Sequence, residues 1–389
     1  MLFIQNGKLL TMAGRSYEKG SILIKNGKIE AIGEISCPSS DIQIIDATNC
    51  WVMPGIIEAH CHIGISEQKK GMEGEDCNEM MDPVTPYLRA LDAINPMDPG
   101  FDDAVRMGIT SVMVGPGSSN IVGGQFLFMK TKGSRRIDDL VLKEPAAMKI
   151  ALGENPKRTY MDKQKLPSTR MSTAALLREV LFEAKQYEQD KEAALQQGNH
   201  TFKTNFRLEP WLPVLRKEIP LKTHVHRADD ILTAIRIAKE YDVRLTLDHC
   251  TEGHLIAEHI AASGFPAIVG PSLASRDKIE TQNIDFKTAG LLHKAGVKVA
   301  ITTDHPVTPL YHLPRCAGIA AREGLGIEEG LRAITINAAE ICGVASRVGS
   351  LEVGKDADIA IFTGNPMEIF TKPLYTLING KIVYQAEKC

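Results

Sequence analysis

Short apolar runs that alternate with amphipathic helical segments dominate the second half of this 389-residue chain. The run PLKTHVH at 220–226 leads into a helical pattern, and VRLTLDH at 243–249 leads into another that stops at Gly264. A third helical pattern stops at Gly296 and is followed by VKVAITTD at 297–304. Buried strands that alternate with helices ending at glycine indicate βαβ units and a parallel sheet.

The same rhythm extends toward the N-terminus. Further apolar runs lie at 110–114, 126–130, 146–152 and 265–270, and one precedes His60. Together with the three runs above they number eight, which is the strand number of a closed (β/α)8 barrel. The fold class is therefore predicted as α/β, with a TIM-type barrel as its main unit.

Both ends of the chain have a different pattern. The segments FIQNGKLLTM and GSILIKNGKIEAIG near the start, and GSLEVGKDADIAIF and LYTLINGKIVYQ near the end, read as strand-turn-strand units. We expect residues 1–50 and 345–389 to pair into a small discontinuous β-sandwich domain. Residues 51–344 would then form the barrel.

The composition is that of an ordinary soluble protein. The net charge is -3, the pI is near 6.4 and 43% of the residues are hydrophobic, so nothing favours a nucleic acid or a membrane as partner. The N-terminal MLFIQNGKLLTM lacks the pattern of a secretory signal, which predicts a cytoplasmic protein. The eight scattered cysteines are then expected to be free thiols.

Polar residues that end the apolar runs define the candidate site, because the active site of such a barrel lies at the C-terminal ends of its strands. On a strand His60 and His62 would both point toward the barrel axis. Any one such residue is more often structural than functional, but several at the same end of one barrel indicate a site. The candidates are His60, His62, Lys149, His224, His226, His249 and Asp304.

Imidazoles and a carboxylate are the usual ligands of Zn²⁺, and they also bind Fe and Mn. We therefore expect a divalent metal, most simply Zn²⁺, in one or two copies. A metal lowers the pKa of bound water from 15.7 to about 7, which supplies a hydroxide at neutral pH. Hydrolysis of a small-molecule substrate follows from this chemistry.

These motifs resemble the amidohydrolase superfamily, and within it the imidazolonepropionase-related and prolidase-like branch. The resemblance covers nearly the whole chain. It rests on the N-terminal NGKI hairpins, MPGIIEAHCH, GITSV, THVH, LDH and TTDH, and on the C-terminal VGSLEVGKDADIAIF and LINGKIVY.

The family pattern implies a role for each matching residue. His60 and His62 would bind the more buried metal, and His224 and His249 the more exposed one. Asp304 would contact the first ion, accept a proton from the hydroxide and pass it to the leaving nitrogen, acting as general base and then general acid. The second metal would polarise the scissile carbonyl.

Two assignments have rivals. The bridging ligand of binuclear members is often a carboxylated lysine, and MKIALGEN resembles that pattern at Lys149, whereas Glu154 is the rival bridge or a substrate contact. His224 is assigned to metal and His226 to substrate, because the ligand on this strand is usually the first of such a pair.

Loops at the strand ends set specificity in barrels, here 66–100 and the basic GENPKR at 153–158. Lys157 and Arg158 would bind a carboxylate, unless NPKR is only a solvated turn. We expect a small acidic or zwitterionic amide as substrate, such as a dipeptide, an N-acyl amino acid or a cyclic amide.

Two other function classes are weighed against this one. A mononuclear deaminase or cyclic-imine hydrolase of the imidazolonepropionase type would carry Glu three residues after the strand-five histidine, where this chain has Arg227. A non-catalytic scaffold would have lost ligands, and none is lost in the sequence. From the resemblance we also expect a homo-oligomer.

Overall fold

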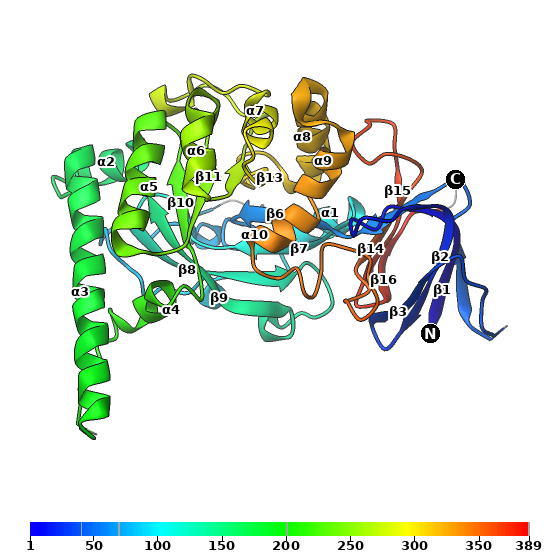
Figure 1. Ribbon diagram of the computed structural model, residues 1–389, viewed down its shortest axis with the longest axis horizontal. Helices are drawn as coiled ribbons and strands as arrows, with labels where there is room; N and C mark the ends of the chain where they lie inside the picture. Colours follow the sequence, from blue (N-terminus) through cyan, green and yellow to red (C-terminus); the bar gives the residue numbers. More distant parts are fainter. Residues whose placement is uncertain (40, 69–70, 200, 388–389) are drawn as a thin grey trace.

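The computed structural model describes residues 1–39, 41–68, 71–199 and 201–387. Its strands form two sheets, one in the middle of the molecule and one at the end where both termini lie (Figure 1). Seven of the cysteines lie in the described residues and all seven are free thiols, as expected, whereas Cys389 lies outside the described residues.

The central sheet carries the candidate site. Its strands are β6 (Ile56–Cys61), β7 (Ile109–Val114), β8 (Val122–Lys130), β9 (Val141–Ala151), β10 (Leu221–Val225), β11 (Leu245–His249), β12 (Ala267–Val269) and β13 (Val299–Ile301). They pair in chain order from β6 to β13. The two outer strands meet where Thr302 Oγ1 donates to the carbonyl of His60 at 2.7 Å. The sheet is thus a nearly closed barrel, and the expected α/β class is confirmed.

One strand direction differs from the prediction of an all-parallel barrel. β8 pairs antiparallel with both β7 and β9, while every other neighbouring pair of the barrel is parallel. Only residues 115–121 and 131–140 connect these strands, and they contain no α-helix. A parallel crossover needs a dozen or more residues, so these short connections make hairpins instead.

The second sheet unites the two ends of the chain. Its strands are β1 (Leu2–Leu9), β2 (Tyr17–Lys25), β3 (Lys28–Gly33), β4 (Gln43–Asp46), β5 (Trp51–Pro54), β14 (Ile359–Phe362), β15 (Pro373–Ile378) and β16 (Lys381–Gln385). The antiparallel pair β5–β14 joins the N-terminal strands to the C-terminal ones. The expected pairing of the ends is present within one sheet, whereas the two-sheet sandwich and the domain boundaries stay predictions.

Helices cover the barrel. They are α1 (Pro99–Arg106), α2 (Glu154–Met161), α3 (Arg170–Gln196), α4 (Leu212–Leu215), α5 (Ala228–Tyr241), α6 (Ala257–Ser263), α7 (Thr288–Lys294), α8 (Leu313–Ala320), α9 (Ile327–Ala333) and α10 (Ile336–Ile341). In Figure 1, α5 to α8 stand side by side along one edge of the barrel, and α3 projects beyond it. No helix of the described ranges is long and apolar enough to cross a membrane.

The long helix α3 is amphipathic. Its apolar stripe is buried at Leu177, Val180, Leu181, Ala184 and Tyr187. The stripe follows the 3.6-residue period of a helix, packs against the neighbouring helices α4 and α5, and joins the same hydrophobic core as the barrel strands.

A charge cluster built on two buried aspartates fastens the terminal sheet to the barrel. We call Lys130, Arg347, Asp356 and Asp358 the Lys130 cluster. Lys130 Nζ, on β8, forms ion pairs with Asp358 and, at 3.1 Å, with Asp356. Arg347 Nη2 lies 2.8 Å from Asp356 Oδ2. Both aspartates precede β14, so these pairs set the position of that strand against the barrel wall.

Candidate metal centre

Every strand that supplies a candidate residue runs in the same direction. His60 lies in β6, Lys149 in β9, His224 in β10 and His249 at the end of β11, while Asp304 follows β13. The reversed strand β8 supplies none of them. The site therefore forms at one end of the barrel even though the barrel is not all-parallel.

The first group consists of His60, His62 and Asp304. One ligand atom from each lies within 4.8 Å of the others. Asp304 Oδ1 is 3.4 Å from His60 Nε2 and 3.3 Å from His62 Nε2, yet this buried oxygen has no hydrogen-bond partner. Three potential ligand atoms that converge at these distances fit a shared metal ion.

Hydrogen bonds on the far side of each ring fix the two imidazoles. His60 Nδ1 lies 2.6 Å from Asp248 Oδ2, and His62 Nδ1 donates to the carbonyl of Gly115 at 2.7 Å. Burial raises the pKa of Asp248, but Lys222 and His60 outweigh it and hold that pKa well below its usual range. Asp248 is thus a carboxylate acceptor, which leaves the Nε2 lone pairs directed at the site.

The electrostatics of this group favour a cation. Burial lowers the pKa of His62, but the Cys77 thiol and Asp304 outweigh burial and raise it to about 10. Burial raises the pKa of Asp304, but His249, His60 and His62 bring it well below its usual range. A carboxylate that holds a proton on a neighbouring imidazole attracts positive charge, and a metal ion can replace that proton.

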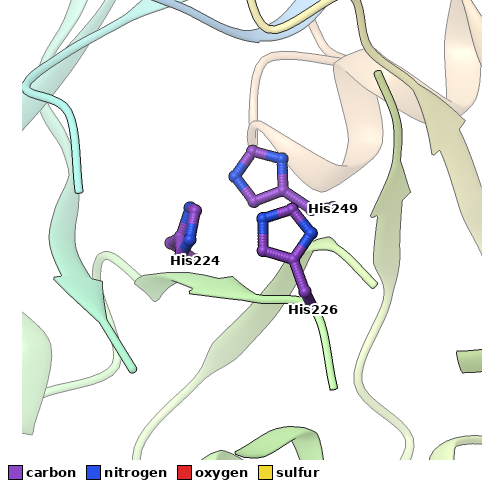
Figure 2. Close-up of side chains that lie close together, drawn as sticks. All are labelled: His224, His226 and His249. Carbon is purple, nitrogen blue, oxygen red and sulfur yellow. The ribbon is translucent and has the colours of Figure 1, made fainter. Parts of the chain in front are cut away.

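The second group consists of His224, His226 and His249, shown in Figure 2. The rings of His226 and His249 are stacked, with centroids 4.7 Å apart, and the ring centroid of His224 lies 4.5 Å from that of His249. His249 Nδ1 donates to the Gly270 carbonyl at 2.9 Å, and its buried Nε2 has no partner. Burial lowers the pKa of His224 and of His249 well below the usual value, so both rings are neutral, as metal ligands must be.

Lys149 adjoins the first group. It is fully buried, and its Nζ is 3.4 Å from His60 Nε2. Its charge contributes, after burial, to lowering the pKa of His60 in one group and of His224 in the other. Burial in turn lowers the pKa of Lys149 to about 8, so its neutral amine forms readily.

A cavity of about 380 Å³ opens over both groups. His62, His224, His226 and Asp304 line it, together with Asn155 and Lys278. Among the described residues that line this cavity, neither Glu154 nor Arg158 occurs. Both belong to α2, where Arg158 is exposed, and their predicted roles in substrate binding stay predictions.

Two functional candidates escaped the sequence reasoning. Asp248 directly precedes His249, so strand alternation would turn the two side chains to opposite faces. Both reach the site because His249 has φ 70°, a left-handed conformation that ends the regular strand. Glu280 follows β12 in an irregular loop that carries no recognisable motif, and its Oε1 lies 3.7 Å from His224 Nε2.

Comparison with known proteins gives a consistent picture. Residues 51–383 match the amidohydrolase family. A solved amidohydrolase of Thermotoga maritima MSB8 is 40% identical, with a TM-score of 0.95 over 99% of this chain and 100% of its own. The amidohydrolase tasK of Hapsidospora irregularis is 26% identical over 94% of this chain, which spans 40% of that protein. An imidazolonepropionase of Maricaulis maris is 26% identical over 90% of this chain and 89% of its own.

Proposed function

This chain belongs to the amidohydrolase family and is a hydrolase acting on carbon–nitrogen bonds, and from that premise we propose that it cleaves a small amide with the help of divalent metal. The substrate class we propose is a dipeptide, an N-acyl amino acid or a cyclic amide. Zn²⁺ is the metal that best suits imidazole and carboxylate ligands, and two ions are proposed.

The observation that carries the proposal is the convergence of unbonded donor atoms in a buried site. Asp304 Oδ1 and His249 Nε2 are buried without hydrogen-bond partners, and each faces other histidines. Orphaned buried polar atoms are costly unless a ligand satisfies them. His60, His62 and Asp304 would hold one ion, and His224 and His249 the other.

A divalent ion bound here supplies Lewis acidity and makes water a nucleophile near neutral pH. Asp304 provides the proton transfer. Its pKa lies well below the usual range, so it is ionised. In that form it can accept a proton from the attacking water. The same carboxylate then gives the proton to the departing nitrogen, because it is positioned at the cavity that admits the substrate.

Lys149 is the bridge that we propose between the two groups, with its side chain carboxylated by CO₂. The neutral amine is the form that reacts, and a pKa of about 8 makes it available. Glu154, the rival bridge, is the first residue of α2 and is only half-buried. It is not among the described residues that line the cavity.

Activity on amides tests the proposed function. Purified protein loaded with Zn²⁺ is offered dipeptides, N-acyl amino acids and cyclic amides, and release of the amine is measured. We expect turnover that D304N lowers by at least about 10²-fold, the usual scale of lost acid–base catalysis. Absence of C–N cleavage by the metal-loaded enzyme across these three classes would refute the proposal.

The carboxylate of the substrate needs a cationic partner. Lys278 lines the cavity, whereas Arg158 is exposed on α2. Comparison of K278M with R158A on a carboxylate-bearing amide decides between them. The variant that raises KM at unchanged metal content identifies the partner, and an unchanged KM in both would refute recognition by either residue.

A specific feature separates this proposal from ring deamination or imidazolonepropionase chemistry. The position at which those relatives would carry a catalytic Glu holds Arg227, whose Nε and Nη2 bind Asp229 at 3.0 Å each. This guanidinium is therefore paired with a carboxylate in the first turn of α5. It offers no carboxylate for proton transfer to a ring, so amide hydrolysis is the function we favour.

A further inference from the structure

Glu280 is a buried carboxylate whose two oxygens have different surroundings. It lies in a single 3-10 turn, Ile279–Thr281, which follows β12, and its exposed fraction is 1%. Oε2 accepts a hydrogen bond from the backbone N–H of Glu154 at 2.9 Å. Gly153 leaves room for this approach, since a Cβ at that position would lie 2.7 Å from Oε2. The backbone of the β9–α2 junction thus holds the carboxylate in place.

The other oxygen is directed at the second group of histidines. Glu280 Oε1 has no hydrogen-bond partner, and it lies 3.7 Å from His224 Nε2 and 4.0 Å from His226 Nε2. These separations are too long for hydrogen bonds. They suit donors that share one ion, because metal–ligand bonds of about 2.0–2.2 Å place two donor atoms roughly 3–4 Å apart.

We propose that Glu280 is a metal ligand, and that with His224 and His226 it joins His249 in holding the ion of the second group. The inference rests on the proposed function and deepens it. It gives the second ion an anionic ligand from the loop after β12 and makes His226 a ligand rather than a substrate contact. Neutral imidazoles together with one carboxylate form a donor set that zinc sites commonly use.

The surrounding charges argue against a role in binding a substrate ammonium group. Lys278 Nζ lies 3.8 Å from Glu280 Oε1 and also donates to Asn155 Oδ1 at 2.7 Å. A substrate cation placed at Glu280 would be repelled both by this ammonium group and by the metal. The carboxylate and the imidazoles attract a directly bound metal ion at short range. This attraction exceeds the repulsion of the ion by the Lys278 ammonium.

The test compares E280Q with D277N. The amide oxygen of E280Q can still accept the bond from Glu154 N–H, so the variant removes only the charge. Asp277 lies in the same loop, lines the same cavity and is exposed, which makes D277N a matched loss of one carboxylate. Zn²⁺ content is measured by plasma mass spectrometry, and the visible absorption of the Co²⁺-loaded proteins reports the ligand set.

We expect E280Q to lose the second ion, or to bind it at least about 10-fold more weakly, and to change the Co²⁺ spectrum. D277N should match wild type in both readouts. Two ions and an unchanged spectrum in E280Q would overturn the inference, even if KM rose. Should E280Q fail to fold, E280D decides: weaker binding of the second ion alone supports the ligand role, and unchanged binding overturns it.

Failure of the inference and failure of the proposed function give different results. If Glu280 is not a ligand, wild type and E280Q both bind two ions. If the proposed function is wrong, metal-loaded wild type cleaves none of the three amide classes, whatever the Zn²⁺ content of E280Q.

Discussion

Asp248 holds the first group in position through the far nitrogen of His60, and D248N tests that arrangement. Asp248 Oδ2 lies 2.6 Å from His60 Nδ1 and 3.0 Å from Lys222 Nζ, and all three residues are buried. The substitution keeps an oxygen that can accept from His60 but removes the charge that orients the ring and raises its basicity. Loss of such a partner usually weakens metal binding about 10- to 100-fold, or about 1.4–2.8 kcal/mol.

The same substitution also lowers stability. Lys222 keeps a hydrogen bond to the carbonyl of Ala59 at 2.9 Å but loses its carboxylate partner. Removing one member of a buried ion pair costs about 3–5 kcal/mol. The double variant D248N/K222M should recover much of the free energy of unfolding while its metal affinity stays low, because only the stability loss arises from the uncompensated ammonium.

Metal affinity is measured by competition with a chromophoric chelator, and stability by urea unfolding of the metal-free proteins. T246V is the control: Thr246 Oγ1 donates to the other oxygen, Asp248 Oδ1, at 2.9 Å, so the variant removes one bond and keeps the charge. Its metal affinity should stay within about threefold of wild type. Metal binding by D248N as tight as in wild type would refute the positioning role of Asp248.

Two further predictions concern the Lys130 cluster. K130M leaves Asp356 and Asp358 without their shared cation, so the free energy of unfolding should fall by about 3–5 kcal/mol with unchanged metal content; a loss below about 1 kcal/mol in urea unfolding would contradict this. Burial raises the pKa of Asp356, but Arg347, Lys130 and Lys28 outweigh it and lower the pKa from 3.8 to about 2. The stabilisation is thus fully present above pH 3.8 and lost as the pH falls through 2, about 2 kcal/mol in all. D356N should lack this part of the pH dependence, and equal slopes in both proteins between pH 5 and 2 would argue against it.

The barrel could be predicted because apolar runs and helical periods are visible in the sequence whatever the order of the strands. Side-chain direction could be predicted because residues two apart on a strand, such as His60 and His62, face the same side. Strand direction is another matter. The apolar run of β8 reads the same in either direction, and only the short connections on both sides of it reveal the hairpins.

The sequence did not reveal Glu280 and Asp248 as candidates, because irregular backbone brings them to the site. Glu280 approaches His224 through a loop with no repeating pattern, so no local signal places it there. Asp248 and His249 share the site because a left-handed residue ends β11, and a single φ value is not encoded in a hydrophobic pattern. Side-chain direction can be read from the sequence where a strand is regular, as at His60, but not where the backbone is irregular, as around Glu280.

Metal stoichiometry per subunit decides whether the centre is binuclear. Wild type and K149A are purified without added metal or chelator and analysed by plasma mass spectrometry. We expect about two ions in wild type and fewer in K149A, because the buried amine lies 3.4 Å from His60 Nε2 and is the bridge proposed between the two groups of ligands. About one ion in both proteins would contradict a binuclear centre bridged by Lys149, and none in wild type would contradict metal-dependent hydrolysis altogether.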